Sequence, residues 1–104
     1  MWIFVSGGFV YIVAHRDKPM HVLVRARHPE HIETLLPGHA QTKNMTADYP
    51  YRVTAHRTVV QRALMYYVMN MEYDNFKSSI DDQHFHDACI SVWRDMYEYG
   101  LRHR

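Results

Sequence analysis

Apolar and polar residues alternate in short runs along the first part of the chain, a pattern typical of β-strands. Residues 2–5 and 9–13 are rich in aromatic and β-branched side chains, and the Ser-Gly-Gly between them predicts a β-hairpin. Residues 21–27 and 51–57 also alternate and predict two further strands, each with one buried face. Residues 39–48 are polar and show no clear pattern, so the sequence does not decide whether they contain a short edge strand.

Three other segments repeat apolar residues with the spacing of an α-helix. The first starts at Pro29 and ends at Pro37-Gly38, and the second starts with the capping box Thr58-Val59-Val60-Gln61. The third runs from about residue 83 to 99 and ends before Gly100. The apolar sides expected to face the core are Ile32, Leu35 and Leu36; Val60, Leu64, Tyr67, Val68 and Met71; and Phe85, Cys89, Val92, Trp93 and Met96.

The order of these elements, β-β-β-α-(β)-β-α-α, predicts the fold class. It favours an α+β domain with an antiparallel sheet and helices packed on one face. The central β-α-β-β-α stretch is interpreted as a ferredoxin-like half, extended by the N-terminal β-hairpin and a C-terminal helix. Because 104 residues is close to the commonest domain size, one domain over residues 1–104 is expected.

Composition narrows the partners and the compartment. Twelve Lys and Arg against eleven Asp and Glu give a formal charge of +1. A dedicated DNA-binding protein is usually much more basic, so the composition does not indicate one. Cys89 is the only cysteine, so no intrachain disulfide can form and a reducing compartment is expected. The apolar start has no basic region and no apolar run reaches the roughly 18 residues of a membrane helix. A cytoplasmic protein without a membrane partner is therefore predicted.

Residues 72–80, Glu-Tyr-Asp-Asn-Phe-Lys-Ser-Ser-Ile, lie between two predicted helices. Asp74 is a good N-cap, and Phe76 and Ile80 stand four apart on one side of a short helix. We interpret this stretch as a structural joint whose aromatic rings, together with Trp93, are buried. The alternative is a polar triad of Asp74, Asn75 and Lys77 for a phosphate or carboxylate group.

Signatures of catalysis and metal binding are weak. Residues 84–89, His-Phe-His-Asp-Ala-Cys, offer two potential ligand pairs, but on a helix these pairs point about 200° apart. Cys89 falls on the predicted core side, where a thiol stays protonated and inert. No phosphate-binding loop or nucleophile elbow is present. We therefore predict no catalytic residue, no metal site and no cofactor.

The arginines on the predicted strands are the candidate binding residues. Neighbouring strands would gather their guanidinium groups on a rigid sheet, with Tyr11 or Tyr51 available for stacking, as in sheet-based RNA binders. The predicted binding residues are Arg25, Arg27, Arg52 and Arg57.

Three segments together resemble a family of small uncharacterised bacterial and phage proteins. The matching residues are Met1, Trp2 and Phe4; Val24–Arg27; Tyr73–Lys77; and Val92, Trp93, Met96 and Tyr97. The resemblance implies a recurring fold and brings no activity with it. Where members occur in mobile elements, it implies a small inhibitor that docks on host machinery, for which anti-CRISPR proteins are the type.

Three functions follow from the sequence, in descending order. The first is a non-enzymatic cytoplasmic protein-interaction module with a host or cognate protein partner, in the manner of a mobile-element inhibitor of host defence. The second is a nucleic-acid-binding module that uses the four arginines. The third is a metal-dependent hydrolase built on the histidines.

Overall fold

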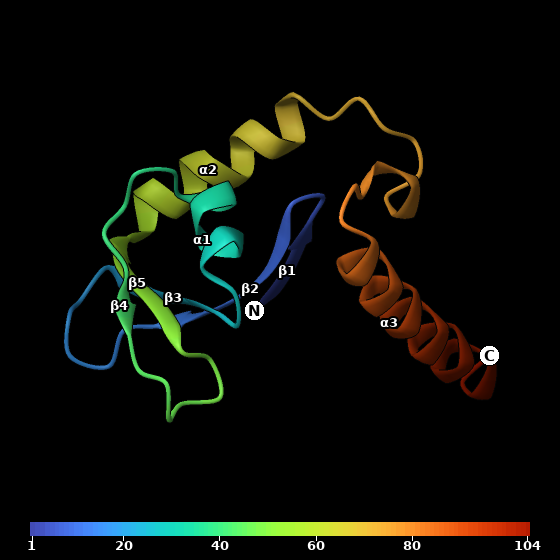
Figure 1. Ribbon diagram of the computed structural model, residues 1–104, viewed down its shortest axis with the longest axis horizontal. Helices are drawn as coiled ribbons and strands as arrows, with labels where there is room; N and C mark the ends of the chain where they lie inside the picture. Colours follow the sequence, from blue (N-terminus) through green and yellow to red (C-terminus); the bar gives the residue numbers. More distant parts are fainter. The chain divides into compact units, whose positions relative to one another are not determined.

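The computed structural model describes residues 1–104, and the chain divides into two compact units, Met1–Glu72 and Tyr73–Arg104 (Figure 1). The first unit holds a β-sheet and two helices, and the second holds a 3₁₀ turn and one long helix. The expectation of one domain over residues 1–104 stays a prediction. No helix of the chain combines the length and the apolar composition that spanning a membrane requires.

The sheet has five strands in the order β1-β2-β3-β5-β4, and all neighbouring strands are antiparallel. The strands are β1 (Trp2–Val5), β2 (Gly8–Ala14), β3 (His21–Ala26), β4 (Thr42–Lys43) and β5 (Tyr51–His56). The α+β fold with an antiparallel sheet is thus confirmed, and the open segment 39–48 contains the edge strand β4.

The middle of the chain forms the predicted ferredoxin-like half. Because β5 is antiparallel to both β3 and β4, those two strands run parallel to each other with β5 between them. Helix α1 (Pro29–Leu35) lies in the connection from β3 to β4, which makes a split βαβ unit, and α2 (Arg57–Met69) follows β5. The hairpin of β1 and β2 extends the sheet on the other side of β3.

Side-chain alternation separates two faces of the sheet, and both helices of the first unit pack on the same one (Figure 1). That face is aliphatic, and it meets α1, Leu36 and the inner side of α2 in one core. The buried core residues are Val10, Ile12, Val22, Val24, Ala26, Ile32, Leu35, Leu36, Val53, Ala55 and Val60. As predicted, Val22 and Val24 are buried on one side of β3, whereas Leu23 and Arg25 lie on the other.

The hairpin turn packs directly against α1, which explains its glycines. A Cβ added at Gly8 would lie 2.6 Å from Cγ of His31, and one at Gly7 would lie 2.6 Å from Cγ2 of Thr34. In addition, the backbone N–H of Phe9 donates to Nδ1 of His31 at 3.2 Å. Only residues without a side chain allow this approach.

Histidines cap both helices of the first unit. Nδ1 of His28 accepts from the N–H of Glu30 at 3.2 Å at the start of α1. Nδ1 of His56 accepts from the N–H of Thr58 at 3.2 Å, so α2 begins at Arg57. The predicted capping box at Thr58 is therefore wrong by position, because an imidazole nitrogen takes the role expected of the hydroxyl.

The predicted inner side of α2 is correct for its first three turns only. Val60 is buried, and Leu64 and Tyr67 pack against the core. Val68 is 67% exposed and Met71, which lies beyond the helix end, is also exposed. The predicted burial of these two residues is wrong, because no residue of α2 after Tyr67 belongs to or packs against the core cluster.

In the second unit, residues Lys77–Ser79 form a 3₁₀ turn and Gln83–Arg102 form α3. Oδ1 of Asp82 accepts from the N–H of Phe85 at 2.9 Å and caps α3. The predicted cap at Asp74 is wrong. Asn75 instead accepts from the N–H of Ser78 at 3.2 Å.

The predicted apolar side of α3 is mostly uncovered. Ile80 and Cys89 are buried, but Trp93 is 49% exposed, and Val92 and Met96 are exposed as well. Tyr73 also remains at the surface. The prediction that Tyr73 and Trp93 are buried is therefore wrong, because 32 residues with a single long helix supply too little chain to cover both rings.

Candidate functional site

Three of the four predicted binding arginines share the sheet face opposite α1 and α2, called the open face below. Arg25 and Arg52 are direct cross-strand partners, and Arg27 lies two residues beyond Arg25 on the same side. Arg57 is the first residue of α2, and the five residue steps from Arg52 to Arg57 span roughly 16 Å of extended chain. The predicted group of four arginines is therefore a group of three, with Arg57 apart from it.

The guanidinium groups on this face already have partners within the chain. The Arg25 guanidinium carbon lies 4.5 Å from the centroid of the Tyr11 ring, and that of Arg27 lies 4.2 Å from the Tyr49 ring. Nη2 of Arg27 pairs with Oδ1 of Asp48 at 3.1 Å. Together these contacts hold the segment before β5 against the open face of the sheet.

Tyr49 is the centre of this arrangement and was not found from the sequence. It is only 7% exposed, its ring lies 5.1 Å from that of Tyr11, and its carbonyl accepts from Nε of Arg52 at 3.4 Å. The residue stands in a polar stretch with no periodicity, so the only signal was one aromatic ring among polar residues. The arginines therefore have a structural role in anchoring Tyr49.

Aromatic rings extend the open face towards β1. The Phe9 ring stacks on Phe4 at 4.5 Å and meets the edge of Trp2 at 5.8 Å, and Trp2 is 63% exposed. Of the two predicted stacking residues, Tyr11 lies on this face. Tyr51 pairs with Ala26 and therefore points to the helix-covered side.

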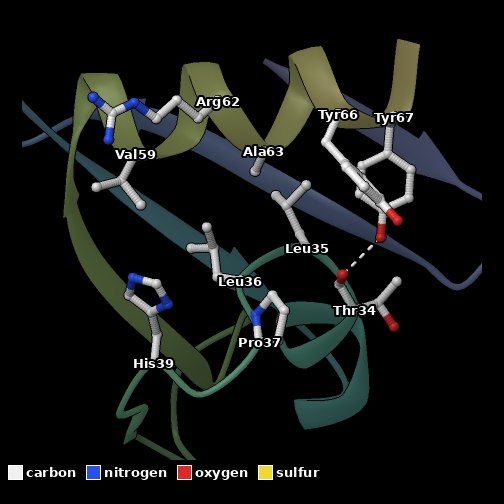
Figure 2. A pocket seen from close by; sticks show the side chains of 10 residues that line it. All are labelled: Thr34, Leu35, Leu36, Pro37, His39, Val59, Arg62, Ala63, Tyr66 and Tyr67. Atoms are coloured by element: carbon white, nitrogen blue, oxygen red, sulfur yellow. Dashed lines mark hydrogen bonds between the residues drawn. The ribbon is translucent and has the colours of Figure 1, made fainter. Parts of the chain in front are cut away.

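A second site lies in the first unit, in an apolar groove between α1 and α2 (Figure 2). Its volume is about 580 Å³, within the range of ligand-binding clefts. Leu35, Leu36 and Ala63 line its middle, as Figure 2 shows. The full lining is Thr34, Leu35, Leu36, Pro37, His39, Val59, Arg62, Ala63, Tyr66 and Tyr67.

The two ends of the groove differ in chemistry. At one end the hydroxyl of Tyr67 donates to the carbonyl of Thr34 at 2.6 Å and joins α2 to α1. Burial, with a smaller contribution from Tyr66, raises the pKa of Tyr67, so its phenol stays protonated. At the other end stand the side chains of Arg62 and His39 (Figure 2).

The apolar lining continues out of the groove along α2. Tyr66 is 64% exposed and Met69, three residues further on the same side, is 76% exposed. Sequence analysis missed this side of α2, although Val59, Arg62, Tyr66 and Met69 recur every three or four residues. The stronger apolar periodicity of the inner side, which packs on the sheet, concealed it.

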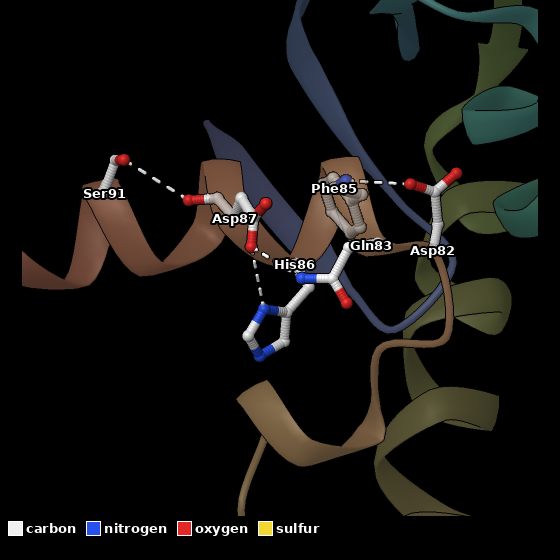
Figure 3. A network of polar contacts seen from close by, with 6 residues as sticks. All are labelled: Asp82, Gln83, Phe85, His86, Asp87 and Ser91. Carbon is white, nitrogen blue, oxygen red and sulfur yellow. Dashed lines mark hydrogen bonds and ion pairs between the residues drawn. The ribbon is translucent and has the colours of Figure 1, made fainter.

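In the second unit the histidine-rich start of α3 forms a local polar network (Figure 3). Oδ1 of Asp87 accepts from Nε2 of Gln83 at 2.8 Å and lies 3.4 Å from Nδ1 of His86. Nowhere in the chain do three His, Cys, Asp or Glu side chains gather to hold a metal ion. Burial raises the pKa of the Cys89 thiol, which disfavours the reactive thiolate.

The predicted polar triad of Asp74, Asn75 and Lys77 is not assembled as a binding site. Asn75 is engaged with the backbone of Ser78, and Nζ of Lys77 lies 4.3 Å from the centroid of the Trp93 ring. The ring of Tyr97 also stacks on Trp93, with 5.5 Å between the ring centroids. Lys77 is therefore part of a local cation–aromatic contact.

Fold and site together define a small α+β domain with an extended split βαβ sheet and an apolar groove between its two covering helices. Comparisons with protein-family models, with curated proteins and with solved structures find no match for this chain. The resemblance to a family of small bacterial and phage proteins stays a prediction.

Proposed function

We propose that this chain is a protein-interaction module that binds a partner protein through the groove between α1 and α2. One observation carries the proposal: an apolar groove of about 580 Å³ is continuous with the exposed side chains of Tyr66 and Met69. Contiguous exposed apolar surface on a protein with its own core is typical of an interaction site.

The composition of the groove supports protein recognition. Tyrosine, methionine and arginine are enriched at protein interfaces, and Tyr66, Met69 and Arg62 lie along one side of α2. The groove also has the form that receives an amphipathic segment, since α2 makes one wall and the end of α1 with the residues that follow it makes the other. Its aliphatic middle can bury one or two apolar side chains of a partner.

A nucleic-acid-binding module is the second candidate, and the open face of the sheet favours it. Arg25 and Arg52 lie side by side there, close to Tyr11, and the exposed Trp2 ring offers a stacking surface. Binding at this face would have to compete with the contacts that hold Tyr49. Arg57 takes no part in this candidate.

Capture from a host lysate by the wild-type chain and by two variants tests both functions. Tyr66→Ala removes an exposed anchor of the groove, and Tyr97→Ala removes a similarly exposed tyrosine from α3 as a matched control. We expect specific proteins to be retained by wild type and Tyr97→Ala and to be lost with Tyr66→Ala. Retention that is unaffected by Tyr66→Ala contradicts the groove proposal.

The same captures, run with and without nuclease treatment, address the second candidate. Nucleic acid in the eluate of the untreated capture, lost when Arg25 and Arg52 are both changed to Glu, supports the open face as the binding site. Such binding should weaken steeply with added salt. The proposal that the partner belongs to a host defence complex predicts that defence components are among the proteins that depend on Tyr66.

A further inference from the structure

The groove between α1 and α2 carries positive charge at one end and no negative charge. Arg62 and His39 are the only side chains in its lining that can be cationic, and no Asp or Glu lines it. Helix α2, residues Arg57–Met69, contains two arginines and no acidic residue. A partner that enters this groove therefore meets a guanidinium group without local competition from a carboxylate.

The Arg62 guanidinium has no ion pair within the chain. The ion pairs Arg27–Asp48, His86–Asp87 and Arg102–Glu98 do not include it. Glu33, on α1, has one oxygen engaged by the backbone N–H of Gly38 at 3.1 Å. Because a guanidinium group presents paired donors that match a carboxylate, Arg62 is suited to a bidentate contact with an acidic side chain.

Geometry sets the direction in which a partner would lie. At one end of the groove, the hydrogen bond from Tyr67 to Thr34 links α2 to α1. Arg62 and His39 flank the opposite end (Figure 2). Apolar side chains of the partner would fill the middle, over Leu35, Leu36 and Ala63. A carboxylate about one helical turn beyond them would reach Arg62.

We propose that the occupant of the groove is an acidic amphipathic helix of a partner protein. Its apolar side chains, spaced three and four residues apart, pack in the groove, and an Asp or Glu on the neighbouring turn pairs with Arg62. This inference rests on the proposed function and adds the charge and the conformation of the partner. Helix-in-groove recognition supplies the affinity, and the ion pair supplies orientation and selectivity.

The test uses the full chain and two labelled synthetic helices in fluorescence-anisotropy titrations. Both peptides have Leu at positions i, i+3, i+4 and i+7, and the remaining charged positions are Glu in one and Lys in the other. We expect the acidic peptide to bind at least about tenfold more tightly than the basic one, since opposed charges favour one partner and like charges reject the other.

Two variants of equal charge assign that preference to the groove. Arg62→Glu should abolish or reverse the preference for the acidic peptide. Arg57→Glu makes the same change five residues away on the same helix, outside the groove lining. It should leave the preference within about twofold in about 0.15 M salt, because Arg57 cannot pair directly with the peptide and the field of an exposed charge is partly screened. Thermal melts of both variants show whether the fold is kept.

The outcomes separate this inference from the proposed function. If both peptides bind equally and Tyr66→Ala abolishes that binding, the proposal of an acidic partner is overturned. The groove is then still supported as a binding site. Equal effects of Arg62→Glu and Arg57→Glu also overturn the inference, because the preference would then follow overall charge. If neither peptide binds, the acidic helix is overturned, and the Tyr66 dependence of lysate capture decides the groove function separately.

Discussion

The two units of this chain contain similar apolar residues but bury them to very different extents. Residues 1–72 hold a core in which Val24, Ala26 and Ile32 are completely inaccessible to solvent. In residues 73–104 only Ile80 and Cys89 are buried, and the rings of Trp93 and Tyr97 remain half exposed. The comparison teaches that helical periodicity predicts an apolar side reliably but does not say whether anything packs against it.

Helices α2 and α3 show the same difference. The inner side of α2 packs on a sheet of five strands, so Val60 is buried and Leu64 joins the core. Helix α3 has only the short segment with the 3₁₀ turn beside it in its own unit, and Cys89 is its only buried residue. The number of residues available to form a second layer decides how far an amphipathic helix is buried.

Removing a leucine from each unit should give the largest contrast. Leu36→Ala creates a cavity at a residue that is 2% exposed and should lower the free energy of unfolding by about 2–5 kcal/mol. Leu101→Ala, the same change at an exposed position of α3, should cost about 0.5 kcal/mol. Urea denaturation followed by circular dichroism measures both, and equal losses would contradict the comparison.

Trp93→Ala should have an intermediate and local effect. Trp93 is 49% exposed and contacts Lys77 and Tyr97, so the loss of its ring should cost about 2 kcal/mol. Amide hydrogen exchange should become faster in α3 and stay unchanged in β2 and β3. A uniform acceleration in both units would show cooperative unfolding of residues 1–104, as the single-domain prediction requires.

The Cys89 thiol should react slowly with thiol reagents, although neighbouring side chains of α3 such as Val92 and Trp93 are exposed. At neutral pH, its reaction with a thiol reagent should be at least about tenfold slower in the native chain than in the unfolded chain, equivalent to 1.4 kcal/mol. Burial both blocks access and raises the thiol pKa. A Met96→Cys chain in a Cys89→Ala background is the control, and it should react rapidly because Met96 is exposed.

Tyr67→Phe should have the smallest effect, about 1 kcal/mol, because it removes the hydrogen bond to the Thr34 carbonyl. Burial raises the folded-state pKa of Tyr67 above about 10, so above that pH the unfolded chain releases the proton more readily. Wild-type stability should therefore fall as the pH rises past 10, and the variant should lose less. Tyr66→Phe is the control, and an equally steep fall in Tyr67→Phe would contradict the assignment.

The fold was largely predictable, whereas the candidate site was predictable only in part. Alternation in residues 21–27 placed Val22 and Val24 on the buried face because strand geometry is local. The same alternation placed Arg25 and Arg52 correctly on the open face. It could not show that Tyr49 would lie over that face, because this contact joins a non-periodic segment to a strand far away in sequence.

The sequence by itself determined the order and type of the elements, the turn of the N-terminal hairpin, and which side of each helix and strand is apolar. These properties depend on residues within one or two helical turns or on adjacent strand positions, where spacing alone specifies which side chains share a face. Tertiary structure alone decided that Arg57 stands apart from the other arginines and that Leu36 and Ala63 meet across a groove. It also decided that the apolar side of α3 stays uncovered within its unit, because burial depends on which distant segment packs against a side chain.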